Sequence, residues 1–466
     1  MQTTEETSER DYAGVIATHL QKATLAEMPS TAIARAKERV LDSIGNLLAG
    51  VDATGNAAAR SVFHGYGGTP DATVVGTGSS LPAPHAAFLN AMSMRSYDYE
   101  AVGAESNDAS MVAAHISGTT VPVALAAGER AGASGAQFLE ALILGDDLAS
   151  RLAVSSGFHT ASGGDNTGTV NVMGGAAIVG KIEGFNETQY RHALGHALNQ
   201  MSGTVQNLFD KASSFKLPQA MAARNAIVSA DLAKAGFSGL HDALTSPFGF
   251  FKLFSPKPNP EALLCSLGES YFGDMIIKPW ASCRAAHPAL DAVVRLRKQH
   301  ALDPGDVEAV EIHVTPTTKN GFTGQDFSDA PASEVDGIFS IPYNVAVGLI
   351  EGTVRPEHLS ADYMARTDVL DLLGRVTLVG SLPPHEYQTA EAIVTTRSGQ
   401  TYRQRVDGVL GDIYRNPLSR EAVLEKFYLN VEFGNRTTKA VSEQIQESVD
   451  HLDELDDLST LLRMIS

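Results

Sequence analysis

The sequence predicts a mainly α fold, in which a large all-helical domain carries a smaller, inserted α+β domain. Helical periodicity dominates from residue 10 to about residue 250, short alternating runs typical of strands follow residue 278, and helical periodicity returns from residue 419. A chain of 466 residues also exceeds the size at which one hydrophobic core usually keeps growing. We therefore expect residues 1–270, completed by residues 412–466, to form the helical domain, and residues 271–411 to form the α+β domain.

Apolar residues at helical spacing define the expected helices. One stripe runs through Ile33–Leu48, and Gly50 is the expected end of that helix. Asn186 is an expected N-cap and Gly236 an expected stop for two later helices. The further stripes occupy residues 120–132, 137–153, 187–201 and 219–235.

The segment after Lys278-Pro279-Trp280 alternates apolar and polar residues, as strands do. The turn sequence Ser398-Gly399-Gln400 joins two of these runs and predicts a hairpin. Helical patterns at residues 343–351 and 356–374 lie between the runs, so the segment as a whole indicates an α+β unit. The expected strands are residues 310–314, 376–378, 392–396 and 401–406.

Composition and charge exclude several classes of protein. The net charge of −19 and the scattered Lys and Arg residues disfavour nucleic acid as a partner, because its phosphate backbone would be repelled. No apolar run reaches the roughly 18 residues of a membrane span, and the acidic start Met1–Glu6 does not resemble a signal peptide. Cys265 and Cys283 are too few for a disulfide framework. We expect a soluble, cytoplasmic protein with no membrane or nucleic-acid partner.

Two motif-like patterns are interpreted as packing features instead of cofactor sites. Residues 175–181 match the spacing of a phosphate-binding loop, but Ile182 replaces the magnesium-binding Ser or Thr and no strand precedes the segment. His192 and His196 have the spacing of zinc ligands on a helix, but Ala193 replaces the glutamate base and no third ligand is evident. We therefore expect no metal, no nucleotide and no other cofactor.

Three polar segments stand out within the helical half. The first combines Asn90–Glu100 with His115, which opens a helical stretch whose positive end would favour the neutral form that a general base requires. The second contains His159 before a glycine-rich stretch, and the third contains Lys216 just before a long helix. Taken singly, each is also compatible with a hydrogen-bonded structural histidine or a solvated lysine.

These segments belong to a longer series of sequence blocks. In chain order the blocks are FLNAMSMRSYDYE, HISGTTVPVALAAGE, GFHTASGG, KLPQAMAARNAIVSADLAKAGFSG, FGFFKLFS, KPWASCRAAHPALDA and FSIPYNVAVGLIEG. The series resembles the MmgE/PrpD family across nearly the whole chain. That family includes 2-methylcitrate dehydratase, cis-aconitate decarboxylase and iminodisuccinate epimerase. The order of the blocks is specific for the family and not for the substrate.

The resemblance implies an all-helical domain, a smaller α+β lid domain and an active site between the two. Asp98 is similar to the first aspartate of the family's D-x-D-D element, His115 to the histidine that follows that element, and His159 to the histidine of its G-x-H element. Lys216 resembles the lysine before the family's A-A helix, and Tyr343 resembles the tyrosine after its F-S. The resemblance therefore implies catalytic roles for these residues.

Three further cations are expected to bind substrate carboxylates through charge-assisted hydrogen bonds. Lys278 and Arg284 lie in the block that resembles K-P-x-x-x-C-R, on the lid side, and Arg95 lies in the first block. The sequence departs from the family pattern at Glu100-Ala101, within the D-x-D-D element, and at Ile116, where the family usually has a proline.

The resemblance implies a small di- or tricarboxylate substrate and a reaction that begins with removal of a proton next to a carboxylate. Such a step needs a base and nearby cations; His115, His159 and Lys216 supply these groups, and Asp98 would orient a histidine. Reprotonation on the opposite face gives epimerisation, loss of a β-hydroxyl gives dehydration, and loss of carbon dioxide gives decarboxylation. Because the D-x-D-D element is reduced to one Asp and one Glu, our first choice is an epimerase similar to iminodisuccinate epimerase, followed by a dehydratase and then a decarboxylase.

One alternative is not an enzyme at all. The chain could be an inactive family member that binds a dicarboxylate or a protein partner, although the presence of His115, His159, Lys216 and Tyr343 together argues against this. The family resemblance also implies a homodimer formed through the helical domain.

Overall fold

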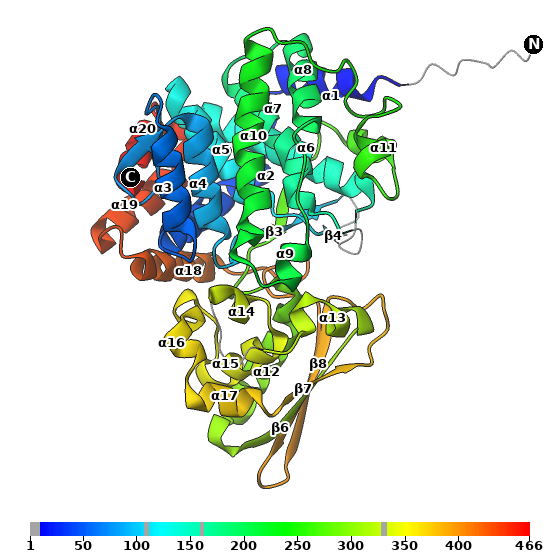
Figure 1. Cartoon of the computed structure of the whole chain (residues 1–466), viewed down its shortest axis with the longest axis vertical. Coiled ribbons are helices and arrows are strands. Elements are labelled where there is room, and N and C mark those ends of the chain that lie inside the picture. Colours follow the sequence, from blue (N-terminus) through cyan, green and yellow to red (C-terminus); the bar gives the residue numbers. More distant parts are fainter. Residues whose placement is uncertain (1–9, 107–110, 159–162, 328–332) are drawn as a thin grey trace, which may run out of the picture.

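The structure is a computed structural model that describes residues 10–106, 111–158, 163–327 and 333–466. Figure 1 shows a helical body above and an α+β unit below. The predicted mainly α fold with an α+β unit in the C-terminal half is confirmed. His159, one of the predicted site residues, lies outside the described residues.

The helical body is built from long helices whose apolar stripes face one another. α2 (Ser30–Gly50) follows the first predicted stripe, and α6 (Gly135–Ser156) packs along α7 (Val170–Ile182). The approach of α6 to α7 is close, because a side chain on Gly145 would meet the carbonyl oxygen of Gly174 at 2.6 Å. The other helices of this part of the chain are α1 (Tyr12–Lys22), α3 (Asn56–Tyr66), α4 (Ala83–Arg95), α5 (Ser117–Ala131), α8 (Glu187–Leu198), α9 (Gln206–Phe209), α10 (Leu217–Lys234) and α11 (Phe250–Phe254).

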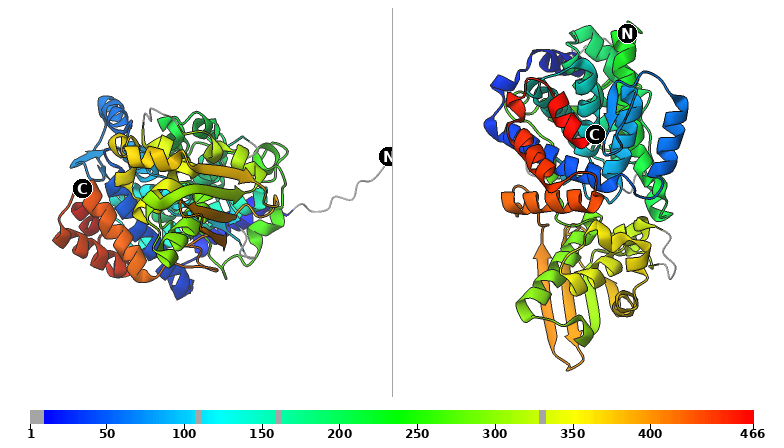
Figure 2. Two further views of the ribbon diagram at one scale, coloured as in Figure 1. Left: turned by 90° about the horizontal axis from the view of Figure 1, so that it is seen from below. Right: turned by 90° about the vertical axis from the view of Figure 1, so that its left-hand side faces the viewer.

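The end of the chain returns to the helical body. α18 (Arg420–Gly434) packs along α2, α19 (Lys439–Asp450) also contacts α2, and α20 (Ser459–Ile465) contacts α5. The right-hand view of Figure 2 shows these orange and red helices lying on the helical body, with α18 at the edge that faces the α+β unit. Phe427 and Leu461 are fully buried in the main core of that body.

Two small sheets within the helical body were not predicted from the sequence. β1 (Ala72–Val74) and β2 (Ser79–Leu81) form an antiparallel pair. β3 (Val102–Glu105) is the central strand of a second antiparallel sheet, between β4 (Met111–Val112) and β5 (Asp274–Ile276). Strands this short carry no readable alternation of apolar and polar residues, yet β5 brings a distant part of the chain beside β3.

The α+β unit is a mixed four-stranded sheet with the order β7-β6-β8-β9, in which only β6 and β7 run parallel. Alternate residues of β8 are buried, as expected for a sheet with one covered face, and α12 packs against β8 and β9. The strands are β6 (Val307–Val314), β7 (Val376–Gly380), β8 (Thr389–Thr396) and β9 (Thr401–Asp407). The helices are α12 (His287–His300), α13 (Pro316–Asn320), α14 (Glu334–Ile338), α15 (Ile341–Glu351), α16 (Ala361–Met364) and α17 (Thr367–Leu373).

Several local predictions are confirmed and one is wrong in detail. Asn186 caps α8, because its side chain accepts a hydrogen bond from the backbone of Gln189. The helical pattern at residues 356–374 is not one helix. It is divided into short helices because Ser360 and Arg366 adopt extended backbone conformations.

The two motif-like patterns lie in ordinary helices. Residues 175–181 are part of α7, and His192 and His196 are part of α8. His196 stacks on Phe237, and its Nε2 lies 2.9 Å from the carbonyl oxygen of the same residue. Over the described part of the chain, no helix has both the length and the apolar character needed to cross a membrane.

We propose that residues 1–270 and 412–466 form one folding unit, to which β5 of the following segment adds a strand. Phe427 of α18 packs so closely on α2 that a side chain on Gly45 would lie 3.3 Å from its ring. A chain that ends at residue 411 should therefore expose the apolar surface of α2 and fail to give a soluble, folded protein. Size-exclusion chromatography and circular dichroism against the full-length protein test this. A soluble truncated chain with a cooperative unfolding transition would contradict the proposal.

Candidate active site

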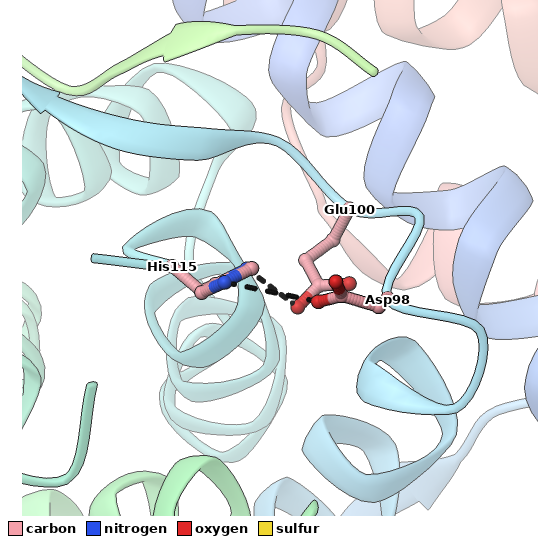
Figure 3. Close-up of side chains that lie close together, drawn as sticks. All are labelled: Asp98, Glu100 and His115. Carbon is pink, nitrogen blue, oxygen red and sulfur yellow. Dashed lines mark ion pairs between the residues drawn. The ribbon is translucent and has the colours of Figure 1, made fainter. Parts of the chain in front are cut away.

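Acidic and basic side chains gather where the loop after α4 meets the segment before α5. α4 ends at Arg95, the loop continues through Asp98 and Glu100 to β3, and His115 lies between β4 and α5. Figure 3 shows the His115 ring facing the two carboxylates. Asp98 and Glu100 are buried, whereas the His115 side chain is 15% exposed. The histidine is therefore the member of this group that solvent or a ligand can reach.

His115 lies closer to Glu100 than to Asp98. Glu100 Oε1 is 2.9 Å from His115 Nδ1, and Asp98 Oδ1 is 3.7 Å from His115 Nε2. The sequence predicted Asp98 as the orienting partner of a histidine, but Glu100 is the nearer carboxylate. A carboxylate that accepts the Nδ1 proton selects the tautomer in which Nε2 is unprotonated and can accept a proton.

Two cations balance the two buried carboxylates. Arg95 Nη1 donates to Glu100 Oε1 at 2.7 Å and also to Asp98. Lys278 Nζ donates to the main-chain carbonyl of Asp98 and lies 3.1 Å from its Oδ2. Burial alone would raise the pKa of Glu100, but Arg95 and His115 outweigh burial and hold that pKa well below its usual range. Glu100 is therefore ionised at neutral pH.

The segment that carries His115 is fixed from two sides. Asp274 of β5 accepts hydrogen bonds from the backbone N–H groups of Ile116 at 3.1 Å and Ser117 at 2.7 Å. Asn171 of α7 donates to the carbonyl oxygen of His115 at 2.7 Å. The Asp274 carboxylate satisfies free amides at the start of α5 and offsets the positive end of that helix. The electrostatic surroundings of His115 therefore include this buried anion as well as the helix.

Asp98, Glu100 and His115 each bring one potential ligand atom within 4.8 Å of the others, a spacing that could hold a metal ion. The charges around them argue for a different use. Arg95 and Lys278 already donate to these carboxylates and would be repelled by a divalent cation bound beside them. The donor set thus fits an ion-pair network around a histidine better than it fits a metal centre.

Lys216 lies in a neighbouring buried pair that spans the two parts of the molecule. Its Nζ donates to the carbonyl oxygen of Thr54 at 2.8 Å and to Glu334 Oε1, at the start of α14, at 3.1 Å. Burial lowers the pKa of Lys216, although Glu334 opposes that shift. The Phe215 ring links this pair to the cluster, with its centroid 5.9 Å from Lys216 Nζ and 5.4 Å from Arg95 Cζ.

Tyr343 and Arg284 occupy different surroundings. Tyr343 is fully buried in the α+β unit, where its hydroxyl donates to the carbonyl oxygen of His358 and its ring stacks on Phe327. Arg284 is half-buried near the ring of Tyr387, and its Nη1 has no hydrogen-bond partner among the described residues. Burial lowers the pKa of Arg284, as expected for a cation without a close carboxylate partner.

Comparison with known proteins identifies the family of the chain. The model of the MmgE/PrpD N-terminal domain matches residues 14–263, and the model of the MmgE/PrpD C-terminal domain matches residues 280–453. The chain belongs to the MmgE/PrpD family. One relative, the cis-aconitate decarboxylase-like protein oryM of Aspergillus oryzae, is 22% identical over 498 residues, which cover 100% of this chain and 99% of that protein. The resemblance inferred from the sequence blocks is thereby confirmed.

In this MmgE/PrpD chain, the structure gathers some of the predicted site residues and separates others. Arg95, Asp98, His115 and Lys278 form one connected group. Lys216 adjoins that group through Phe215. Among the described residues, no hydrogen bond or ion pair joins Arg284 or Tyr343 to it, and His159 lies outside those residues.

Glu100 and Glu334 are members of the site that sequence reasoning did not include. Glu100 carried a signal, because Asp98 and Glu100 are two residues apart and residues at that spacing share one side of an extended segment; in the structure they do so across a bend at Asp98. No feature of the sequence pointed to Glu334. Its partner Lys216 is 118 residues away in the sequence, and only the tertiary fold brings a contact of that kind together.

Replacing Glu100 by Gln should lower the free energy of unfolding at neutral pH by about 3 kcal/mol, because Arg95 stays buried with one carboxylate fewer. The folded pKa of Glu100 lies below the usual 4.5, so this contribution is complete above about pH 4.5 and is lost as the pH falls toward the folded pKa. Urea unfolding of both proteins between about pH 7 and pH 3 measures the difference, which should stay constant down to about pH 4.5 and shrink below it.

Glu443→Gln is the matched control for that comparison, because the Glu443 side chain is 57% exposed on α19. This variant should change the stability by no more than a few tenths of a kcal/mol, roughly, at any of these pH values. A Glu100→Gln difference that does not depend on pH would rule out the assigned charge pairing.

Proposed function

We propose that this MmgE/PrpD protein is an enzyme that removes a proton from the carbon next to a carboxylate in a small di- or tricarboxylate. The Glu100–His115 pair carries the proposal. Its 2.9 Å contact at Nδ1 favours the tautomer in which Nε2 accepts a proton. The partial exposure of His115 beside fully buried charges supports its choice as the base.

The enolate-like charge formed by proton removal requires cations near the substrate. Arg95 Nη1 lies 2.9 Å from His115 Nδ1 and 3.0 Å from Nε2, so a substrate carboxylate that draws Arg95 toward itself would leave Nδ1 to Glu100 and free Nε2 beside the reacting carbon. Arg284, which has no acidic partner within ion-pair distance among the described residues, suits a second carboxylate. The sequence predicted that Lys278 binds the substrate. Because Lys278 is fully buried and bound to Asp98, we instead assign it the role of fixing the position of Asp98.

Epimerisation is the first candidate for the overall reaction. It requires two proton-transferring groups on opposite faces of one carbon. We assign the second role to Lys216, whose pKa burial lowers; Lys216 is as buried as Lys278 and must leave Glu334 to act. Decarboxylation is the second candidate, because the Aspergillus oryzae relative that spans the whole chain is named cis-aconitate decarboxylase-like. Dehydration additionally needs an acid that protonates the leaving oxygen.

Activity should survive removal of metal ions, because the carboxylates nearest to His115 already have Arg95 and Lys278 as partners. The enzyme is dialysed against a strong chelator and assayed with and without added divalent cations. We expect the rate to be unchanged within the error of the assay. Loss of activity that one metal restores would overturn the metal-free mechanism.

Solvent deuterium incorporation distinguishes the possible reactions. Proton NMR in heavy water, with a panel of di- and tricarboxylates, follows α-proton exchange, elimination and loss of carbon dioxide together. His115→Gln and Lys216→Met should each lower turnover by about 100-fold to 10,000-fold, as loss of a general acid or base does. For an epimerase, each variant should still exchange the α-proton of one stereoisomer while failing to invert the centre.

His192→Gln on α8 and the exposed Lys234→Met on α10 are matched controls, and both should retain full activity. If folded His115→Gln and Lys216→Met proteins turn over at near-normal rates, the proposed base and acid are wrong. If the wild-type protein neither exchanges nor converts any carboxylate but binds one, the inactive dicarboxylate-binding alternative holds instead.

A further inference from the structure

Tyr99, the residue between Asp98 and Glu100, is held by a buried cation from the end of the chain. Lys426 of α18 donates from Nζ to the carbonyl oxygen of Tyr99 at 2.7 Å, and the Tyr99 ring centroid lies 3.9 Å from the same nitrogen. The Lys426 side chain is only 4% exposed. The two residues are 327 positions apart in the sequence, so this contact depends on the return of the chain to the helical body.

The loop needs support at this point because Asp98 has a left-handed backbone conformation, with φ 47°. That conformation costs a residue other than glycine about 1 kcal/mol or more. Lys278 donates to the carbonyl oxygen of Asp98, and Lys426 donates to the next carbonyl, that of Tyr99. Two lysines from different parts of the chain therefore fix two consecutive carbonyl groups. Both carboxylates turn toward His115 from this bend (Figure 3).

Lys426 is itself fixed by α2. Asp42 Oδ1 lies 2.6 Å from Lys426 Nζ, and Asn46 donates to the other Asp42 oxygen at 3.0 Å. Asn430, one turn after Lys426, donates to Asn46 Oδ1 at 2.9 Å. All of these side chains are buried. The packing of α18 on α2 thus determines where the Tyr99 carbonyl can lie.

We propose that Lys426 is a positioning residue for the candidate active site, whose bond to the Tyr99 carbonyl keeps Glu100 within hydrogen-bond distance of His115 Nδ1. Lys426 acts through the loop and does not contact His115. The expected effect of Lys426 on turnover rests on the proposed function. The expected effect on the tautomer of the His115 ring does not, because it can be measured in the protein without substrate.

The test compares Lys426→Met with the double variant Asp42→Asn/Lys426→Met. The single variant leaves Asp42 buried without its cation, which by itself can prevent folding. The double variant removes both charges, keeps Asn at position 42 as a partner for Asn46, and still leaves the Tyr99 carbonyl without its lysine. Asp147→Asn/Arg151→Met is the matched control, because it too removes both members of a buried ion pair. Arg151 is equally buried, pairs with Asp147 at 2.7 Å and donates to the carbonyl of Cys265 at 2.7 Å, but contacts no part of the loop from Asp98 to Glu100.

Nitrogen-15 NMR of the His115 ring is the first readout, with the signal assigned by its absence in His115→Gln. In the wild-type protein the shifts should report protonation at Nδ1, toward Glu100. In the Lys426 variants we expect a mixture of tautomers. The second readout is steady-state kinetics, in which kcat should fall by about 100-fold, the scale of a misplaced catalytic group, while KM changes much less.

The control variant distinguishes a change in the position of Glu100 relative to His115 from a general loss of protein stability. Asp147→Asn/Arg151→Met should lower the midpoint of thermal unfolding without changing the His115 signals or kcat. If a folded Lys426 variant keeps the wild-type tautomer and the wild-type kcat, the inference is wrong. If the tautomer changes while turnover does not, Lys426 remains a positioning residue and His115 is not the base, so the failure of the proposed function is distinguished from the failure of this inference.

Discussion

The burial of the Asp98 and Glu100 carboxylates is the constraint on which the rest of the site depends. A carboxylate without a partner away from water costs several kcal/mol, roughly, so each one requires a cation that is buried with it. Arg95, at the end of α4, and Lys278, just after β5, supply these cations. This requirement explains why the pairing of β3 with β5 matters, since it brings Lys278 next to a loop that lies far away in the sequence. His115 is left as the one partly exposed group.

A second buried pair ties the helical body to the α+β unit. Lys216 belongs to the first and Glu334 to the second, and Thr54 contributes both its carbonyl and its hydroxyl to the same junction. The Tyr99 hydroxyl adds a bond to the carbonyl oxygen of Pro279 at 3.0 Å. Any motion that separates the two parts must break these bonds.

The long helices of the fold could be predicted because the information that specifies them is local. The stripe through α2 and the cap at Asn186 are readable within a single segment of sequence. The strands of the helical body could not be predicted, because β4 has only 2 residues and β5 only 3. Their existence depends on pairing partners elsewhere in the chain. The same reasoning applies to the division of the helical pattern at residues 356–374, which the surrounding packing imposes.

The sequence by itself determined the family, the mainly α fold and the types of ionisable side chain at the site. It did so because the polar blocks around Asp98 and His115 are recognisable between apolar helical stretches. Only the tertiary structure decided which of these groups meet. It placed Glu100 nearer to His115 than Asp98, and it brought Lys426 to the loop from 327 positions away from Tyr99. The physical reason is that a buried charge is stabilised by whatever partner the fold delivers within about 3 to 4 Å, and sequence separation carries no information about that distance.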